Sequence, residues 1–392
     1  MVIAIFGGSF NPPHREHIAA ARAALSQLKP DRFFMIPPNE PPHKSLAEES
    51  PGLDERLELL RIATGELEGV EILDIELRRP APSYTADTLR ELDGLYPEAE
   101  FYFLLGTDMA EGFDQWKDSE YLLARAALAV FTREKGEDER LKDAADRLVK
   151  QYGARIVYLE KEPVRLSSTQ VRELLRGRDG VELLNSEVYR RIIKHRYFGA
   201  KPNFDWLWRQ VREFYAPERI PHVEGCEKEA VSLARHWGAD EGNAREAAIL
   251  HDITKKMTNP EQLLLGKKYG IMTGDAETCH PKLMHAPTGA ALSRDLFGIG
   301  DEVYGAILWH TTGRPGMTLL EKIIYLADYI EPTRSFDGLR DLRKLAYENI
   351  DEAMIFGLEL SLQDLQKKGI SPDSRSQAAL DVLRNERERR RT

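Results

Sequence analysis

Two histidines near the start of the chain have the spacing of a phosphate-binding pair. His14 and His17 lie three positions apart behind the rigid segment Asn11-Pro12-Pro13, and a helix that begins near His14 places both imidazoles on one face. Both rings can donate hydrogen bonds to phosphate oxygens, and the free amides and dipole of a helix start favour an anion. The pattern fits chemistry on a nucleotide phosphate, although two such histidines can equally decorate a helix surface.

The residues before this helix predict a buried strand and a tight turn. Val2–Phe6 is short, apolar and partly β-branched, which is typical of a strand buried on both faces of a parallel sheet. Gly7 and Gly8 let the backbone turn and approach a ligand closely, and Ser9 and Phe10 continue the turn. A Gly-Gly pair alone would indicate no more than a turn.

Four further polar segments follow predicted strands or open predicted helices. Their hydroxyls, amides and cationic side chains can converge on phosphate or carboxylate oxygens, and each could instead serve as a helix cap or a surface connector. The candidate residues are His43 and Lys44 in a proline-rich loop, Ser83, Tyr84 and Thr85, then Gly106, Asp108 and Trp116, and finally Ser167, Ser168, Thr169 and Arg172.

The string Gly-Gly-Ser-Phe-Asn-Pro-Pro-His at 7–14 resembles the signature of the nucleotidyltransferase superfamily, in the form found in the nicotinate mononucleotide adenylyltransferase family. The four polar segments are similar to further elements of that family. One departure is visible, because the family often has a glycine where this chain has Glu16. A carboxylate there would repel a triphosphate, so we expect the Glu16 side chain to point away from it.

The resemblance implies a role for each segment. It places residues 7–17 and 167–172 around the triphosphate of ATP, with positive charge added by the proline-rich loop. It places the 83–85 turn against the nicotinate ring and its carboxylate, Asp108 near a ribose or a phosphate contact, and Trp116 beside the pyridine base.

The implied reaction is adenylyl transfer from ATP to nicotinate mononucleotide, which yields deamido-NAD and pyrophosphate. Alignment and charge neutralisation drive such chemistry, so His14 and His17 would stabilise developing charge and Mg²⁺ would arrive with ATP. The acceptor could instead be nicotinamide mononucleotide, because pocket loops rather than the core motifs set that choice.

A second set of candidate ligands lies in the other half of the chain. His222, the adjacent His251 and Asp252, and the distant Asp328 provide two imidazoles and two carboxylates. Such a set suits a borderline divalent metal with open coordination positions. A single His-Asp pair would indicate only a hydrogen-bonded helix histidine.

The strings that begin at His285 and His310, and the segment 326–334, resemble the HD-domain metal phosphohydrolases, and in particular the symmetrical diadenosine tetraphosphatases, over residues 204–385. The resemblance implies iron or a similar divalent metal on the four candidate ligands, and contacts with an ADP moiety from Arg219, His285, His310 and Arg334. The metal would activate water to split diadenosine tetraphosphate into two ADP. Lys255 could offset phosphate charge or lie in solvent, and a nucleotide-sensing module without hydrolysis is the rival reading.

The predicted secondary structure that positions these residues differs between the two halves of the chain. Strands are expected at Val2–Phe6, Arg32–Pro37, Val70–Leu77, Phe101–Leu105, Ala127–Phe131 and Arg155–Leu159. They alternate with helices and predict a Rossmann-like α/β fold with a parallel sheet. A break at Tyr197–Asn203 is followed by helical patterns only. We therefore expect an adenylyltransferase domain at 1–198 and an all-α HD domain at 203–392.

Composition narrows the function classes further. A length of 392 residues suits two or three domains, and a formal charge of −10 argues against a broad nucleic-acid-binding surface. No run of 18 apolar residues indicates a membrane segment, so the expected location is the cytoplasm. Cys226 and Cys279 are interpreted as ordinary reduced thiols, and the arginine-rich end 384–392 as a solvated helix end. A homo-oligomer is compatible with these features.

Overall fold

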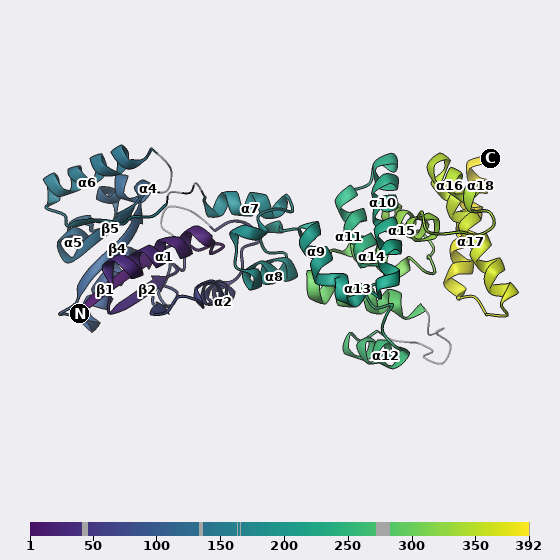
Figure 1. Ribbon diagram of the computed structural model, residues 1–392, viewed down its shortest axis with the longest axis horizontal. Helices are drawn as coiled ribbons and strands as arrows, with labels where there is room; N and C mark the ends of the chain where they lie inside the picture. The colour runs from purple at the N-terminus through teal and green to yellow at the C-terminus, as the bar shows by residue number, and fades with distance from the viewer. Residues whose placement is uncertain (41–45, 133–135, 163, 165, 272–282, 392) are drawn as a thin grey trace. The chain divides into compact units, whose positions relative to one another are not determined.

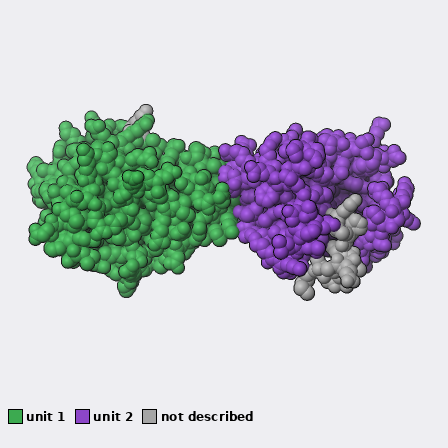
Figure 2. Space-filling model, turned by 60° about the horizontal axis from the view of Figure 1, so that its bottom comes forward, with its two compact units in different colours: residues 1–203 green, residues 204–392 purple. Residues whose placement is uncertain are grey.

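The computed structural model describes residues 1–40, 46–132, 136–162, 164, 166–271 and 283–391. The chain divides into two compact units, residues 1–203 and 204–392, which are coloured separately in Figure 2. No helix in the described ranges is both long enough and apolar enough to cross a membrane.

The first unit contains a parallel sheet of six strands in the order β3-β2-β1-β4-β5-β6, which confirms the predicted Rossmann-like fold (Figure 1). The strands are β1 Val2–Gly7, β2 Arg32–Ile36, β3 Val70–Ile72, β4 Glu100–Gly106, β5 Ala126–Phe131 and β6 Ile156–Tyr158. The chain runs outward from β1 to β3 and then returns to β4 beside β1. This reversal opens a crevice at the carboxyl ends of β1 and β4, where open α/β sheets bind ligands.

Helices cover both faces of the sheet because the strand side chains alternate between two apolar cores. Ile5 belongs to a core with Leu89 and Leu148, while Ala4 belongs to the opposite core with Ala20. The helices of this unit are α1 Arg15–Leu28, α2 Leu53–Thr64, α3 Thr85–Leu95, α4 Thr107–Glu111, α5 Ser119–Arg125, α6 Asp138–Tyr152, α7 Ser168–Arg176 and α8 Ser186–His195.

The third strand is shorter than its apolar alternation predicts. β3 ends at Ile72 instead of Leu77. The amide of Leu73 still donates to the carbonyl of Met35 at 3.0 Å, but the amide of Leu77 then donates to Asp74 in a turn at 2.9 Å. Leu73 and Ile75 nevertheless pack against the core. The alternation of apolar residues over 70–77 therefore reflects which side chains are buried, and it continues past the last residue paired in the sheet.

The second unit is helical throughout its described residues, as the sequence predicts (Figure 1). Its α-helices are α9 Phe204–Val211, α10 Ile220–Trp237, α11 Glu241–Leu250, α12 Asn259–Lys268, α13 His285–Phe297, α14 Asp301–Trp309, α15 Leu319–Ile330, α16 Leu339–Glu348, α17 Ile350–Lys367 and α18 Ser374–Arg391.

The arginine-rich end is more ordered than a solvated helix end. Residues 384–391 are the last part of α18, which packs along α17. The N–O distances of its ion pairs are 2.7 Å for Arg384 with Glu359, 3.5 Å for Arg387 with Glu352 and 2.7 Å for Arg390 with Asp351. The acidic residues of α17 therefore explain why the terminal helix is rich in arginine.

Fragments 1–203 and 204–392 are each expected to fold with a cooperative thermal transition, since each unit has its own core. A fragment that stops at 198 should be less stable than 1–203 by at least about 2 kcal/mol, because the hydrogen bonds that it lacks include two from backbone amides to the rest of the unit. These run from the amide of Lys201 to Leu175 at 2.9 Å and from that of Asn203 to the Tyr189 hydroxyl at 2.8 Å. Urea unfolding of both fragments measures the difference, and equal stability would contradict it.

Candidate active sites

The first candidate site is a cavity of about 430 Å³ at the carboxyl ends of β1 and β4. It gathers predicted residues from segments that are far apart in the sequence. Those in its lining are Gly7, Gly8, Ser9, His14, His17, Ser83, Tyr84, Thr85, Gly106, Asp108, Trp116, Ser167, Ser168, Thr169 and Arg172. The predicted His43 and Lys44 lie outside the described residues.

The two histidines occupy the first turn of α1. His14 is the N-cap and His17 follows it, with the rings stacked at a centroid distance of 3.7 Å. The backbone amide of His14 donates to Nδ1 of His17 at 3.2 Å. Since Nδ1 is an acceptor, the neutral His17 ring carries its proton on Nε2. His17 is therefore oriented as an Nε2 donor, and its side chain also lines the cavity.

The start of α7 meets the start of α1 at this cavity. Arg172 Nη1 donates to the carbonyl of Asn11 at 2.7 Å, and Ser168 Oγ to that of Pro12 at 3.3 Å. Ser167 caps α7 by accepting the amide of Gln170 at 3.2 Å. Two helix N-termini with their hydroxyls and one guanidinium therefore border the same cavity, an arrangement suited to an anion.

Phe10 is the one described candidate of this unit that does not line the cavity. Its ring is buried and meets Phe6 edge-to-face at a centroid distance of 5.4 Å. A Cβ on Gly8 would lie 3.1 Å from the Phe10 ring. Gly8 is therefore needed for close packing on Phe10, and Phe10 supports the turn from the core side.

Sequence reasoning missed Arg56, which holds the loop after β2. Its guanidinium is buried and donates to the carbonyls of Pro38 and Asn39, both at 3.0 Å. The amide of Asn39 in turn donates to Ser83 Oγ at 3.1 Å. A buried charge on an otherwise apolar helix face is the signal that could have identified it. Arg56 therefore ties the loop to the turn that opens α3.

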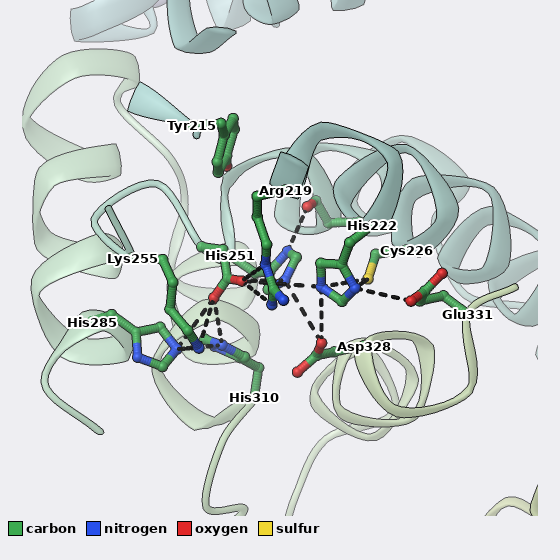
Figure 3. Close-up of polar contacts among 12 residues, drawn as sticks. Tyr215, Arg219, His222, Cys226, His251, Lys255, His285, His310, Asp328 and Glu331 are labelled. Atoms are coloured by element: carbon green, nitrogen blue, oxygen red, sulfur yellow. Dashed lines mark hydrogen bonds and ion pairs between the residues drawn. The ribbon is translucent and has the colours of Figure 1, made fainter. Parts of the chain in front are cut away.

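The second candidate site lies among α10, α11, α13, α14 and α15 (Figure 3). The four predicted metal ligands converge there. His222 Nε2 lies 3.1 Å from Asp328 Oδ1 and 4.0 Å from Asp252 Oδ2, while His251 Nε2 lies 3.5 Å from Asp252 Oδ2 and 4.0 Å from Asp328 Oδ1. Ligands that bind one ion at about 2.1 Å lie within about 4.2 Å of each other. These four distances satisfy this limit.

Asp252 is shared by two groups of side chains. Its Oδ2 accepts from Arg219 Nε at 2.8 Å and faces His222 and His251. Its Oδ1 lies 3.2 Å from His285 Nε2 and 3.5 Å from His310 Nε2. The family resemblance implies that His285 and His310 contact ADP, and their position beside this carboxylate also suits metal ligation.

The histidines are oriented for ligation by their other ring nitrogen. Nδ1 of His251 lies 2.7 Å from the carbonyl of Ala248, and Nδ1 of His310 lies 2.6 Å from that of Ile307. A carbonyl only accepts, so each Nδ1 carries the proton and each Nε2 presents a lone pair to the centre. His251 Nε2 and Asp252 Oδ1 are buried and have no hydrogen-bond partner among the described residues. The donor set therefore fits a divalent metal.

The protonation states agree with this fit. Burial alone would raise the pKa of Asp252, but His251, His285 and His310 outweigh burial and hold it well below its usual range. Burial likewise opposes ionisation of Asp328, and His222, His251 and Arg334 hold its pKa low. Burial lowers the pKa of His285 to about 4. Ionised carboxylates and neutral imidazoles are the forms that bind metals.

Sequence reasoning missed two neighbours of His222. Cys226 Sγ lies 3.4 Å from His222 Nε2, and the thiol belongs to a group with His222, His251 and Asp328 that could hold a metal. Glu331 Oε1 lies 3.0 Å from His222 Nδ1 and is fully buried. Helical spacing was the available signal, because Cys226 is four positions after His222 and Glu331 three after Asp328.

The two arginines assigned to an ADP contact, and Lys255, lie at the carboxylates of this site. Arg334 Nη2 donates to Asp328 Oδ1 at 2.5 Å, and Arg219 donates to Asp252. Lys255 Nζ lies 3.5 Å from Asp252 Oδ1 and 3.0 Å from His285 Nε2. These cations are partly exposed at the rim of the ligand set.

Glu331→Gln is expected to weaken divalent metal binding by roughly 10- to 100-fold, because the carboxylate orients His222 and raises the basicity of its other nitrogen. The apparent Kd from competition with a metal indicator measures this. Glu348→Gln is the matched control, since Glu348 is exposed on α16. Unchanged metal affinity in a folded Glu331→Gln protein would contradict the orienting role.

Comparison with known proteins agrees with the two-part architecture. Residues 5–174 match the cytidylyltransferase-like family and residues 219–333 match the HD domain family. A probable nicotinate-nucleotide adenylyltransferase from Gloeobacter violaceus is 39% identical over 186 residues, which cover 47% of this chain and 89% of that protein. A symmetrical bis(5'-nucleosyl)-tetraphosphatase from Bacillus subtilis is 40% identical over 169 residues, which cover 42% of this chain and 89% of that protein.

Among solved structures, a predicted HD superfamily hydrolase involved in NAD metabolism from Clostridium acetobutylicum aligns with a TM-score of 0.46 and 32% identity, over 48% of this chain and all of that one. Both sequence relatives are covered along most of their length at or near 40% identity. The chain therefore belongs to two families, the cytidylyltransferase-like nicotinate-nucleotide adenylyltransferases and the HD-domain family that includes symmetrical bis(5'-nucleosyl)-tetraphosphatases.

Proposed function

We propose that the first unit transfers the adenylyl group of ATP to nicotinate mononucleotide, giving deamido-NAD and pyrophosphate. The observation that carries this proposal is the meeting of the α1 and α7 N-termini at one cavity, joined by the bond from Arg172 to Asn11. Relatives named as adenylyltransferases support it.

The residues of the cavity suit this reaction without a side-chain nucleophile. The acceptor phosphate attacks the α-phosphorus of ATP in line with the departing pyrophosphate, so the protein must align the reactants and neutralise charge. His17 Nε2 is an oriented donor for a phosphate oxygen, and Arg172 with the α7 hydroxyls would hold the outer phosphates. Mg²⁺ bound to ATP would supply further charge neutralisation.

Two aromatic residues of the lining suit a flat aromatic acceptor. Tyr84 and Trp116 line the cavity, and Trp116 stacks on Phe113 with a centroid distance of 4.8 Å. The start of α3 at Thr85 offers free amides to a carboxylate. Pyrophosphate release with nicotinate mononucleotide, compared with nicotinamide mononucleotide at equal concentration, tests this assignment. Faster pyrophosphate release with nicotinamide mononucleotide would indicate that this compound is the acceptor instead.

We propose that the second unit is a metal-dependent phosphohydrolase that cleaves diadenosine tetraphosphate symmetrically into two ADP. The observation that carries this proposal is the position of Asp252, whose Oδ2 faces His222 and His251 and whose Oδ1 faces His285 and His310. Iron or another divalent transition metal on His222, His251, Asp252 and Asp328 would lower the pKa of a water molecule and polarise a phosphoryl oxygen.

The chain's own cations would bind the polyphosphate around that centre. Arg219, Arg334 and Lys255 each reach a ligand carboxylate from a partly exposed position. A polyphosphate entering the site would offer them competing oxygens, and arginine can bind phosphate in a bidentate manner. They would hold the substrate while the buried histidines keep their Nε2 atoms directed at the centre.

The rival function is a nucleotide-sensing module that binds a dinucleotide without hydrolysis. Incubation of the purified whole chain with a hundredfold excess of diadenosine tetraphosphate separates the two functions. Release of many equivalents of ADP per chain supports the hydrolase. Saturable binding of the dinucleotide with no ADP release would overturn it and favour the sensor. Adenylyl transfer by the same preparation tests both proposals on one sample.

A further inference from the structure

The Glu16 side chain is largely buried beside the proposed triphosphate site and is paired with Lys161, which lies in the segment after the edge strand β6. Lys161 Nζ donates to Glu16 Oε2 at 2.7 Å. The side chains are only 6% exposed for Lys161 and 12% for Glu16, so water screens the pair weakly. Arg15 also approaches Glu16 at 3.8 Å, but its side chain is half-exposed and the distance is longer.

Both members of the pair line the cavity that contains His14, His17 and Arg172. The expectation that Glu16 points away from the nucleotide site is therefore wrong, because its side chain lines the cavity. A carboxylate left unpaired in this position would repel the phosphates of a nucleotide, and partial burial would strengthen the repulsion. Paired with Lys161, it contributes no net charge to the cavity.

The pair is not required to attach the segment that carries Lys161. The side-chain amide of Gln27 on α1 already binds the backbone of Glu160 twice, as donor to its carbonyl and as acceptor from its amide, both at 2.8 Å. Lys161 Nζ also donates to the carbonyl of Glu162 at 2.9 Å. A buried ion pair adds little stability compared with a neutral pair of similar size, so its place in the cavity lining calls for a functional reason.

We propose that Glu16 and Lys161 act as one unit of the nucleotide site, in which Lys161 neutralises Glu16 and thereby lets a nucleoside triphosphate bind beside that carboxylate. Lys161 is in this sense a positioning residue for the triphosphate. The identity of the ligand rests on the proposed adenylyl transfer, whereas the pair itself rests on the geometry alone.

A double-mutant cycle on the full chain tests the unit. Lys161→Met leaves the carboxylate uncompensated and is expected to raise the KM for ATP by at least about tenfold, with a smaller change in kcat. Glu16→Gln leaves the lysine uncompensated and is expected to lower that KM. The double variant Glu16→Gln/Lys161→Met is neutral again, and its KM should return to within about threefold of the wild-type value.

Two further variants keep the test interpretable. Lys161→Arg retains the charge and should bind ATP better than Lys161→Met, which also covers the case in which the methionine variant folds poorly. Lys150→Met removes an exposed lysine from α6 and serves as the matched control. An unchanged KM in Lys161→Met would overturn the proposal. A double variant as impaired as Lys161→Met would also overturn it, because Lys161 would then act on the nucleotide independently of Glu16.

Calorimetric binding of the α,β-methylene analogue of ATP, without any acceptor, separates this inference from the proposed function. If no acceptor supports pyrophosphate release in the wild type, adenylyl transfer fails as the function. The same four proteins would still support the unit if the Kd follows the predicted cycle. Equal Kd values across the cycle would overturn it even if adenylyl transfer is confirmed.

Discussion

Asp252→Asn is expected to reduce diadenosine tetraphosphate hydrolysis by roughly three orders of magnitude and to lower the bound metal, while adenylyl transfer stays near the wild-type rate. Asp252 presents one carboxylate oxygen to His222 and His251 and the other to His285 and His310. Loss of its charge therefore weakens both groups at once. Lewis-acid stabilisation is worth several kcal/mol, and each 1.4 kcal/mol is a factor of ten in rate.

Metal content by mass spectrometry and both activities are measured on the same preparation. Asp252→Ala should behave at least as severely as Asp252→Asn, because it removes the oxygens as well as the charge. Asp301→Asn is the matched control, since Asp301 is 99% exposed and pairs only at the surface with Arg294. Retained metal with full hydrolysis would remove Asp252 from the site. Equal loss of both activities would mean that the two units are functionally coupled.

Local patterns are enough to predict where the candidate residues of the first cavity lie, because its segments are short and continuous. The β1 strand, the two glycines and the first turn of α1 follow one another within seventeen residues, so backbone geometry alone places His14 and His17 at a strand end. The start of α7 can also be predicted from the local sequence, because Ser167 and Gln170 form a capping box. The approach of α7 to α1 depends on the sheet order, which the pattern of strands does not specify.

Residues that act through a neighbour were harder to predict. The apolar helix face around Arg56 indicates that its side chain is buried, but the two carbonyls that it binds, those of Pro38 and Asn39, cannot be predicted from that pattern. Cys226 shares a face of α10 with His222, and Glu331 directly follows α15, three positions after Asp328. Spacing alone does not separate these two from surface residues. The contact between Glu16 and Lys161 joins residues 145 positions apart. Only the folded sheet brings these two together.

The second site shows the same limit in another form. The four predicted ligands lie close together, but no pattern in the sequence predicts that His285 and His310 face the other carboxylate oxygen of Asp252. Their rings come from α13 and from the end of α14, and helix packing alone brings them to that carboxylate. Ligand type can therefore be predicted from residue chemistry, whereas the sharing of one carboxylate requires the packed helices.

His17→Ala is expected to lower the rate of adenylyl transfer by about 10²- to 10³-fold, the scale of losing one charge-stabilising donor. The fold should persist, because the helix cap lost with the ring is worth only about 1 kcal/mol. His195→Ala is the control, since His195 is exposed on α8 of the same unit. Hydrolysis by the second unit should not change in either variant.

Two amide substitutions identify which nitrogen of His17 matters. Asparagine places an acceptor near the position of Nδ1, so His17→Asn can keep the bond from the amide of His14 but loses the Nε2 donor. Glutamine reaches the position of Nε2, so His17→Gln can keep a donor toward the cavity. If the structure orients Nε2 at the transferred phosphate, His17→Gln retains substantially more pyrophosphate release than His17→Asn at saturating ATP. The reverse order would assign the role of His17 to capping α1, and full activity in both would remove it from the reaction.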